Sequence, residues 1–194
     1  ASDAGMRALE NQTAVGAPGS HEWCASAVSL AGRPDCRCVV NATGLQGGPE
    51  CYPVRGQLVL VKAPYVRMAM GEYNTKDRSY PTYVYPRRDH VVLGSTYLEG
   101  DGDTEVRDET TEDIVRRAAE FIPELATAPI LAEVVCIRPG RKEGVRLEHE
   151  FVQDGGAGFH VVHNYGHGGA GMSLAWGCAG DVVGHVREAI ASGA

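Results

Sequence analysis

The stretch HNYGHGGAGMSLAWGCAGD, residues 163–181, decides the fold of this sequence. Its residues 166–171 follow the spacing GxGxxG, which is typical of a turn that binds a dinucleotide, and an apolar run at 159–162 precedes them. A complete dinucleotide-binding unit also needs a second strand and an acidic residue beyond the helix, and only the residues up to 194 remain here. We therefore expect this turn to bring a helix N-terminus against a ligand that another part of the molecule holds.

The four glycines of this turn, at 166, 168, 169 and 171, allow the backbone to approach a ligand more closely than side chains would permit. A helix N-terminus carries about half a positive charge and backbone N–H groups that lack partners within the helix. Such a terminus stabilises an anionic group, for example a phosphate or the electron-rich edge of a reduced flavin. The turn alone does not distinguish between a phosphate and a flavin as its ligand.

The composition is typical of a globular protein, with 43% hydrophobic and 22% charged residues. The net charge of −7 argues against a general affinity for nucleic acid or for an anionic membrane. No apolar run approaches the ~18 residues of a membrane span, and residues 1–20 lack the apolar core of a signal peptide. The six cysteines show no disulfide spacing, so we expect reduced thiols and an intracellular location.

No metal site is expected from the sequence. The cysteines between residues 36 and 51 lack the C-x2-C spacing that is usual for zinc ligands. His160, His163 and His167 lie close in sequence, but His163 ends an expected strand and His167 lies in the glycine turn. Their side chains therefore need not converge, and no acidic or cysteine ligand stands beside them.

Hydrophobic patterns predict a chain of mostly strands with two helices. The expected strands are residues 38–42, 57–62, 65–70, 82–85, 90–97, 130–137, 145–151 and 159–163. One helix begins at an N-cap, Thr110 or Thr111, and presents an apolar face that includes Ile114 and Ala118. The last helix covers roughly residues 170–191. Because strands dominate between residues 55 and 137, we predict a mostly antiparallel sheet there.

Five groups of motifs occur in order from about residue 38 to the end of the sequence. They are VNATG (40–44), YPVRGQ (52–57) with AP (63–64), TYVYP (82–86) with VLGST (92–96), IRP (137–139) with GVRLE (144–148), and HNYGHGGAGMSLAWGCA (163–179). In this order they resemble the C-terminal part of the FAD-dependent D-amino-acid oxidase family, which includes the D-aspartate oxidases.

The resemblance implies an α+β / α/β fold made of a partial FAD-binding layer, of the glutathione-reductase-like type, and an antiparallel substrate-binding sheet under a covering helix. Residues 1–52 would be a remnant of the FAD-binding domain, residues 53–137 the substrate-binding sheet, and residues 138–194 the C-terminal part of the FAD-binding domain. We expect residues 39–42 and 159–163 to share one sheet.

The resemblance also implies a substrate site. Arg138 would bind the substrate carboxylate through two parallel hydrogen bonds, and the Tyr83 hydroxyl would meet the same carboxylate. Tyr80 matches a second tyrosine of the family, over the substrate, after a shift of one residue, and the Gly169 carbonyl would accept from the substrate ammonium. The alternatives are a strand-end surface arginine and tyrosines that simply pack on a sheet.

FAD is the cofactor that the resemblance implies. Thr43 would lie near it, and Arg146 would either contact the flavin or form a structural ion pair. The residues expected to line the flavin are Gly168, Gly169, Ala170, Gly171, Met172 and Ser173.

The implied reaction is oxidative deamination of a D-amino acid by molecular oxygen. Hydride transfer from the substrate Cα to the flavin gives an imino acid, and then a 2-oxo acid, ammonia and hydrogen peroxide. Neutral D-amino acids are the expected substrates. Lys76 and Arg78, which precede the TYVYP motif, leave a D-aspartate-type oxidase as an alternative, although solvated loop cations are the simpler interpretation.

The family begins with a strand–GxGxxG–helix unit that holds the ADP half of FAD, and residues 1–38 contain no such pattern. We therefore expect these residues to be the C-terminal part of an oxidase, completed by a missing N-terminal segment or by a second chain. The isolated chain would then be poorly soluble or need a partner. The alternative is a non-catalytic, oxidase-derived subunit of a larger assembly. The resemblance implies a peroxisomal location, although the sequence ends in ASGA without the family's targeting tripeptide.

Overall fold

The computed structural model describes residues 38–73, 81–153 and 158–192. These residues divide into two compact units, which are described separately. Unit 1 takes its described residues from 1–51, 145–166 and 173–194, and unit 2 takes its residues from 52–144 and 167–172. Helices and mainly antiparallel strands occur together, which confirms the α+β class.

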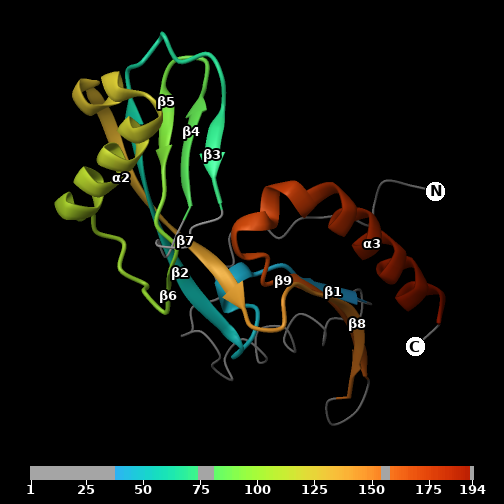
Figure 1. The fold of residues 1–194 in the computed structure, drawn as a ribbon. Helices are drawn as coiled ribbons and strands as arrows, with labels where there is room; N and C mark the ends of the chain where they lie inside the picture. Colours follow the sequence, from blue (N-terminus) through green and yellow to red (C-terminus); the bar gives the residue numbers. More distant parts are fainter. Residues whose placement is uncertain (1–37, 74–80, 154–157, 193–194) are drawn as a thin grey trace. The chain divides into compact units, whose positions relative to one another are not determined.

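A six-stranded sheet forms the body of unit 2 (Figure 1). Its strands are β2 (Cys51–Val61), β3 (Met70–Glu72), β4 (Thr82–Pro86), β5 (Val91–Gly94), β6 (Leu98–Glu99) and β7 (Ile130–Arg141). The order across the sheet is β3-β4-β5-β2-β6, and β7 also pairs with β2. Strand β2 pairs antiparallel with β5 and β6, and β4 pairs antiparallel with β3 and β5. The sequence predicted this antiparallel arrangement.

Helix α2 (Asp108–Phe121) covers one face of this sheet, and the short 3-10 helix η2 (Pro123–Thr127) follows it (Figure 1). The register places Val59 opposite Leu93 and Leu93 opposite Val84, so the three side chains share a face. All three are fully buried, and they belong to one core with Ile114 and Ala118 of α2. The apolar face predicted for this helix is therefore the face that packs on the sheet.

The opposite face of the sheet, called the open face below, carries the residues between those of the core. Because successive side chains of a strand alternate between faces, Leu58, Gly94 and Tyr83 form one row of this face. Leu60, Val92 and Tyr85 form the next row. The side chains of both rows are half-buried, in contrast to the fully buried rows beneath α2.

Helix α2 begins earlier than the sequence predicted. Its N-cap is Arg107 in an extended conformation, and neither Thr110 nor Thr111 caps it. The Gln57 side chain from β2 accepts from the Arg107 backbone N–H (3.1 Å) and donates to the Arg107 carbonyl (2.9 Å), so a strand residue anchors the helix start. Thr111 lies inside the first turn and accepts from Gln57 (2.9 Å).

The strand predicted at residues 65–70 is wrong. A turn follows Pro64, where the Val66 backbone N–H donates to the Ala63 carbonyl (3.0 Å), and β3 begins only at Met70. Tyr65 is 49% and Met68 68% exposed, so this stretch lacks the alternating burial of a sheet strand.

Unit 1 contains a three-stranded sheet with the order β1-β9-β8. Its elements are β1 (Cys38–Asn41), η1 (Gly44–Gln46), β8 (Arg146–Val152), β9 (Phe159–Tyr165) and most of α3 (Gly171–Ala191), which follows η3 (Gly168–Ala170). Strand β1 pairs in parallel with β9, and β8 pairs antiparallel with it. The expectation that residues 39–42 and 159–163 share a sheet is confirmed.

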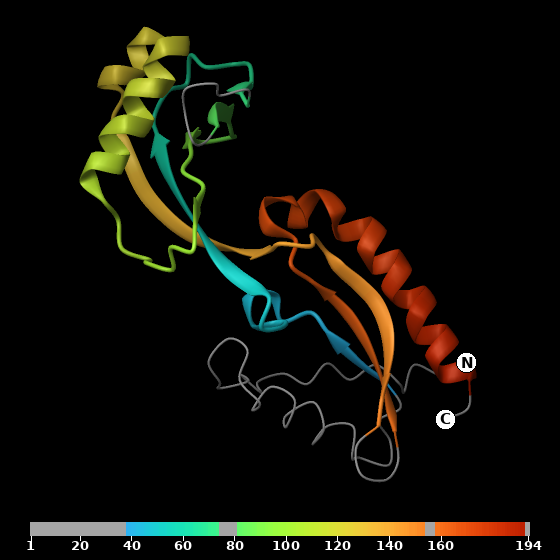
Figure 2. The ribbon, with the colours of Figure 1, turned by 60° about the horizontal axis from the view of Figure 1, so that its bottom comes forward.

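Helix α3 lies along this sheet (Figure 2), and Cys178 and Ala189 are its buried residues. Its remaining apolar side chains are largely exposed: Trp176 is 91% and Val183 47% exposed. Among the described residues, no helix combines the length and the apolar character needed to cross a membrane.

Candidate functional site

Arg138 lies near the end of β7 with its guanidinium group over Gly56 of β2. A Cβ atom at Gly56 would lie 2.2 Å from Arg138 Nη1, so only a glycine leaves room for this group. Gly56 is two residues from Leu58 on the same strand, which places the guanidinium on the open face. Arg138 Nη1 donates to the Thr96 carbonyl (3.1 Å) and Nη2 to Ser95 Oγ (3.2 Å), and these bonds fix its orientation.

Tyr83 lies on the same face and covers a second glycine. A Cβ atom at Gly94 would lie 2.2 Å from the ring of Tyr83, and the ring also stacks on Tyr85 with 4.6 Å between centroids. Gly94 immediately precedes Ser95, the residue that bonds Arg138. The two candidate substrate residues therefore occupy one face, each in a space that a missing side chain leaves.

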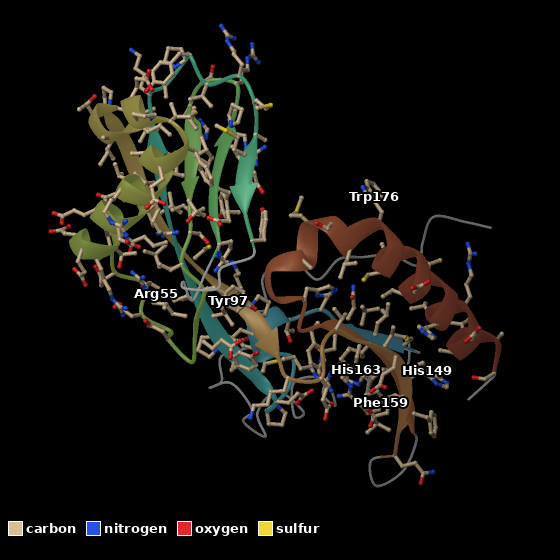
Figure 3. The ribbon with its side chains drawn as sticks, in the orientation of Figure 1. Arg55, Tyr97, His149, Phe159, His163 and Trp176 are labelled. Carbon is tan, nitrogen blue, oxygen red and sulfur yellow. The ribbon has the colours of Figure 1, made fainter. Side chains whose placement is uncertain are left out.

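Three residues of this site were not identified from the sequence: Ser95, Thr96 and Tyr97. The first two hold Arg138, and the Tyr97 ring lies beneath its guanidinium with 5.6 Å between Cζ and the ring centroid. Tyr97 is labelled in Figure 3. Arg117 of α2 supports the same segment from the helix side, since its Nη2 donates to the Ser95 carbonyl (3.3 Å). Ser95 and Thr96 lie in the VLGST motif, but the motif assigned them no role, because their contacts with Arg138 join distant strands.

The glycine turn passes beside Arg138. A Cβ atom at Gly169 would lie 3.7 Å from Arg138 Cδ, and one at Gly168 would lie 3.7 Å from the Tyr97 hydroxyl. Gly168 has φ of +54°, which favours glycine. Gly169 and Ala170 are exposed, and α3 starts at Gly171. Exposed backbone at a helix N-terminus without bulky side chains fits the anionic edge of a flavin.

Thr43 and Ser173, two of the predicted cofactor residues, belong to unit 1, whereas residues 167–172 belong to unit 2. Thr43 is exposed and follows β1, with its hydroxyl donating to Asn41 Oδ1 (2.8 Å). Met172 is 90% exposed. Tyr80, Lys76 and Arg78 lie outside the described residues.

Arg146 forms the structural ion pair that was one of its two predicted roles. Its guanidinium pairs with Glu148 and Glu150 of the same strand, and its Nη1 donates to the Tyr165 hydroxyl (2.9 Å). Tyr165 in turn donates to Glu50 (2.8 Å). Burial raises the pKa of Tyr165 to about 12, so this phenol stays protonated and keeps its donor role at neutral pH.

The histidines of β9 serve hydrogen bonding. His160 and His163 are three residues apart and lie on opposite faces of the strand. His160 bonds His149 (2.7 Å), and His163 bonds Glu150 (3.1 Å). Within the part of the chain that the structure describes, no group of three or more histidine, cysteine or acidic side chains converges as metal ligands do. Cys136 and Cys178 carry free thiols.

The fold of this chain is similar to that of solved oxidase structures. The solved structures with a similar fold include glycine oxidase from Geobacillus kaustophilus, with a TM-score of 0.66 at 23% identity over 78% of this chain and 41% of that one. The family model described as FAD dependent oxidoreductase matches residues 1–184. The chain belongs to this family, whose cofactor is FAD.

Curated relatives include the D-amino-acid oxidase of Streptomyces coelicolor, 42% identical over 158 residues that cover 79% of this chain and 48% of that protein. Human D-aspartate oxidase is 38% identical over 162 residues, which cover 81% of this chain and 46% of that protein. The chain thus spans about half the length of the curated relatives that it matches.

Proposed function

We propose that this chain carries the substrate side of an FAD-dependent oxidase that deaminates D-amino acids. The observation that carries the proposal is the guanidinium of Arg138, held on an open sheet face beside Gly169 and on the same face as Tyr83. A half-buried, oriented guanidinium suits a carboxylate, because its planar donors match the two carboxylate oxygens.

The residues of unit 2 would orient the substrate. Arg138 would hold the carboxylate, the Tyr83 hydroxyl would donate to it, and the Gly169 carbonyl would accept from the ammonium group. Three fixed contacts around one carbon atom determine which of its substituents faces the cofactor, and orientation of this kind supplies a large part of the rate enhancement. Bound FAD would supply the acceptor for the hydride and then pass the electrons to oxygen. The products would be a 2-oxo acid, ammonia and hydrogen peroxide.

Neutral D-amino acids are the substrates that this site favours. The two rows of the open face that β2, β4 and β5 form, next to the Arg138 guanidinium, contain only neutral residues. These are Leu58, Leu60, Tyr83, Tyr85, Val92 and Gly94. An acidic side chain would find no second cation in these two rows. D-Aspartate is the alternative, supported by the similarity to D-aspartate oxidase and by Lys76 and Arg78.

We also propose that protein outside these 194 residues completes the FAD site, either as a further segment of the same chain or as a second chain. The support is that the chain covers less than half of its curated relatives and that α3 exposes apolar side chains. The peroxisome remains the predicted compartment, and microscopy of the tagged protein in its own cells would test it.

The visible spectrum and the mass of the natively purified protein test the proposal. We expect flavin absorption near ~450 nm, as for any bound flavin, and a mass larger than that of this chain. Under nitrogen, D-alanine should bleach the flavin at lower concentration than D-aspartate, and L-alanine should not bleach it. Bleaching by D-aspartate first would overturn the neutral-substrate assignment and leave the oxidase chemistry intact.

A non-catalytic subunit is the second candidate, and the exposed Trp176 and Val183 of α3 favour it, since apolar helix surface of this kind needs a covering partner. A colourless species within a large assembly would support this function and overturn the oxidase. The presence of the oriented Arg138 guanidinium supports oxidase activity over a non-catalytic role.

A further inference from the structure

The side chain of Asn41, at the end of β1, uses its full hydrogen-bonding capacity. It is 2% exposed, and its Nδ2 donates to the Gly47 carbonyl (3.0 Å) and to His163 Nδ1 (3.2 Å). Its Oδ1 accepts from the Thr43 backbone N–H (3.3 Å) and from the Thr43 hydroxyl (2.8 Å). Two donors and two acceptor positions are all engaged, so the amide has one orientation and ties both ends of the loop of residues 43–47 to β9.

This orientation of Asn41 determines the proton position on His163. Since Nδ1 faces the Asn41 donor, Nδ1 accepts, and Nε2 carries the proton that it donates to Glu150 (3.1 Å). Burial and the nearby Arg146 lower the pKa of His163, and Glu150 and Glu148 partly oppose them. The neutral imidazole is therefore the form that fits at neutral pH.

The described groups around His163 come from all three strands of the sheet. The charged neighbours are those of β8, where Arg146 pairs with both Glu148 and Glu150. The edge-on ring of Tyr165 on β9 lies 5.7 Å away between centroids, and Asn41 approaches from β1. Of these neighbours of His163, the Asn41 amide also forms hydrogen bonds with the loop of residues 43–47.

Protonation of His163 at Nδ1 conflicts with the bonds of the loop. Two N–H donors would then face each other, and the Asn41 amide would have to turn so that Oδ1 faces the imidazolium. The turned amide would point its NH2 group at the Thr43 donors and its oxygen at the Gly47 carbonyl. A change of one proton on β9 would thus break the loop's contacts with β1.

We propose that Asn41 and His163 are positioning residues that hold the loop of residues 43–47 in place, and that protonation of His163 releases this loop and weakens the binding of FAD. The inference rests on the proposed function, because it takes Thr43 to lie beside the flavin. Neither residue needs to touch the cofactor, since both act through the loop.

The first test follows the loop without using activity. In the natively purified protein, labelled with 15N-threonine and 13C-histidine, we expect the Thr43 amide resonance to shift between pH 8 and pH 5 with the same midpoint as the His163 ring. His163→Asn places a permanent acceptor toward Asn41 and should abolish the Thr43 titration. His149→Gln, which removes a histidine of β8 that bonds His160 instead, is the matched control and should leave it unchanged.

A second variant, Asn41→Asp, should shift the pKa of His163 upward, opposite to the lowering in the wild type. Asn41→Asp keeps the acceptor for Thr43 but replaces the donor to His163 with a carboxylate oxygen, which should raise the pKa of His163 by about one unit or more. A Thr43 amide that titrates independently of His163, or that still titrates in His163→Asn, would overturn the inference.

The link to the cofactor is tested by flavin retained after gel filtration at each pH. We expect the wild type to lose most of its flavin on the acid side of the His163 midpoint, and His163→Asn to show no such loss. If Thr43 follows His163 but flavin retention does not, the link between the loop and FAD is wrong. If the protein contains no flavin at any pH, the proposed function fails instead.

Discussion

The two helices of this protein differ in how much of their apolar surface their own unit covers. Helix α2 of unit 2 presents Ile114 and Ala118 to the sheet, where both are at most 1% exposed. Helix α3, mostly in unit 1, leaves Trp176 91% and Ile190 43% exposed, although it is the longer and more apolar helix. Unit 2 therefore buries the apolar face of its helix against its own sheet, whereas much of the apolar surface of α3 is exposed.

The two units also differ in their proposed roles, because one would bind substrate and the other would approach the cofactor. The guanidinium that we propose to bind substrate lies in unit 2, where sheet and helix share a buried core. The Thr43 loop, which would approach the cofactor, lies in the unit with the exposed helix. Under the proposed function, unit 2 would orient the substrate, and protein beyond these residues would complete the cofactor site.

Loss of the Ile114 side chain tests the core of unit 2. Ile114→Ala should lower the free energy of unfolding by about 4 kcal/mol, because it leaves a cavity at a fully buried position. Denaturant unfolding measures this change. Val106→Ala, at a residue 40% exposed just before the helix, is the control and should have little effect. Equal losses at both positions would mean that the core beneath α2 is not the main support of unit 2.

Removal of the Arg138 cation tests the site that this core supports. Arg138→Met should lower kcat/KM of the natively purified enzyme about 100-fold, since losing one partner of a buried charge pair costs ~3 kcal/mol. Stopped-turnover assays with D-alanine measure the effect. Arg141→Met removes a cation three residues along the same strand, which bonds Gly144 and Glu143, and should retain activity. Comparable loss in the control would argue against a specific carboxylate contact.

A charge at Trp176 tests whether a partner covers α3. Trp176→Glu should weaken association in the native species by about 2 kcal/mol or roughly 30-fold, as for a buried aromatic residue of an interface. Analytical ultracentrifugation gives the mass at each concentration. Arg187→Gln, an exposed polar change on the same helix, should leave the mass unchanged. If Trp176→Glu also leaves it unchanged, the exposed side of α3 is not the covered surface.

The smallest effect concerns the start of α2. Partial burial acts to raise the pKa of Asp113, but hydrogen bonds from Arg116 and Arg117 outweigh it and hold the pKa below its usual range. Asp113 therefore adds stability above pH 4 that is lost as the pH falls and the carboxylate gains a proton. Asp113→Asn should cost less than ~1 kcal/mol at pH 7, and its difference from the wild type should shrink as acid protonates Asp113 in the folded protein. Thermal unfolding between pH 3 and 7 measures it, with Glu112→Gln on the same helix as the control.

The sequence predicted the strands and helices whose burial follows a simple period. Strand β4 is an example, because buried and half-buried side chains alternate along it. Strand β9 was predicted from a continuous apolar run instead, and nearly all of its residues are buried. The prediction at residues 65–70 failed because Pro64 starts a turn there and only Val66 is buried. The start of α2 was missed because its anchor, Gln57, lies 50 residues away from Arg107.

The site divides in the same way. Motifs around Arg138 and Tyr83 led to their assignment, which stays a prediction, and the structure places both on one face through Gly56 and Gly94. The sequence assigned no role to Ser95, Thr96 or Tyr97, although the first two lie in the VLGST motif, because each contacts Arg138 only after β5 and β7 have both joined the sheet. Their assignment as site residues remains a prediction until the variants are measured.

Gly56 and Gly94 impose a steric condition on this site. A single methyl group at either position would displace the guanidinium or the phenol that lies over it, although neither glycine would touch a substrate. A descendant that kept Arg138 and Tyr83 but acquired alanine at 56 or 94 would retain the familiar residues and lose their placement. The placement of Arg138 and Tyr83 therefore depends on the identity of residues 56 and 94 as well as on the arginine and tyrosine themselves.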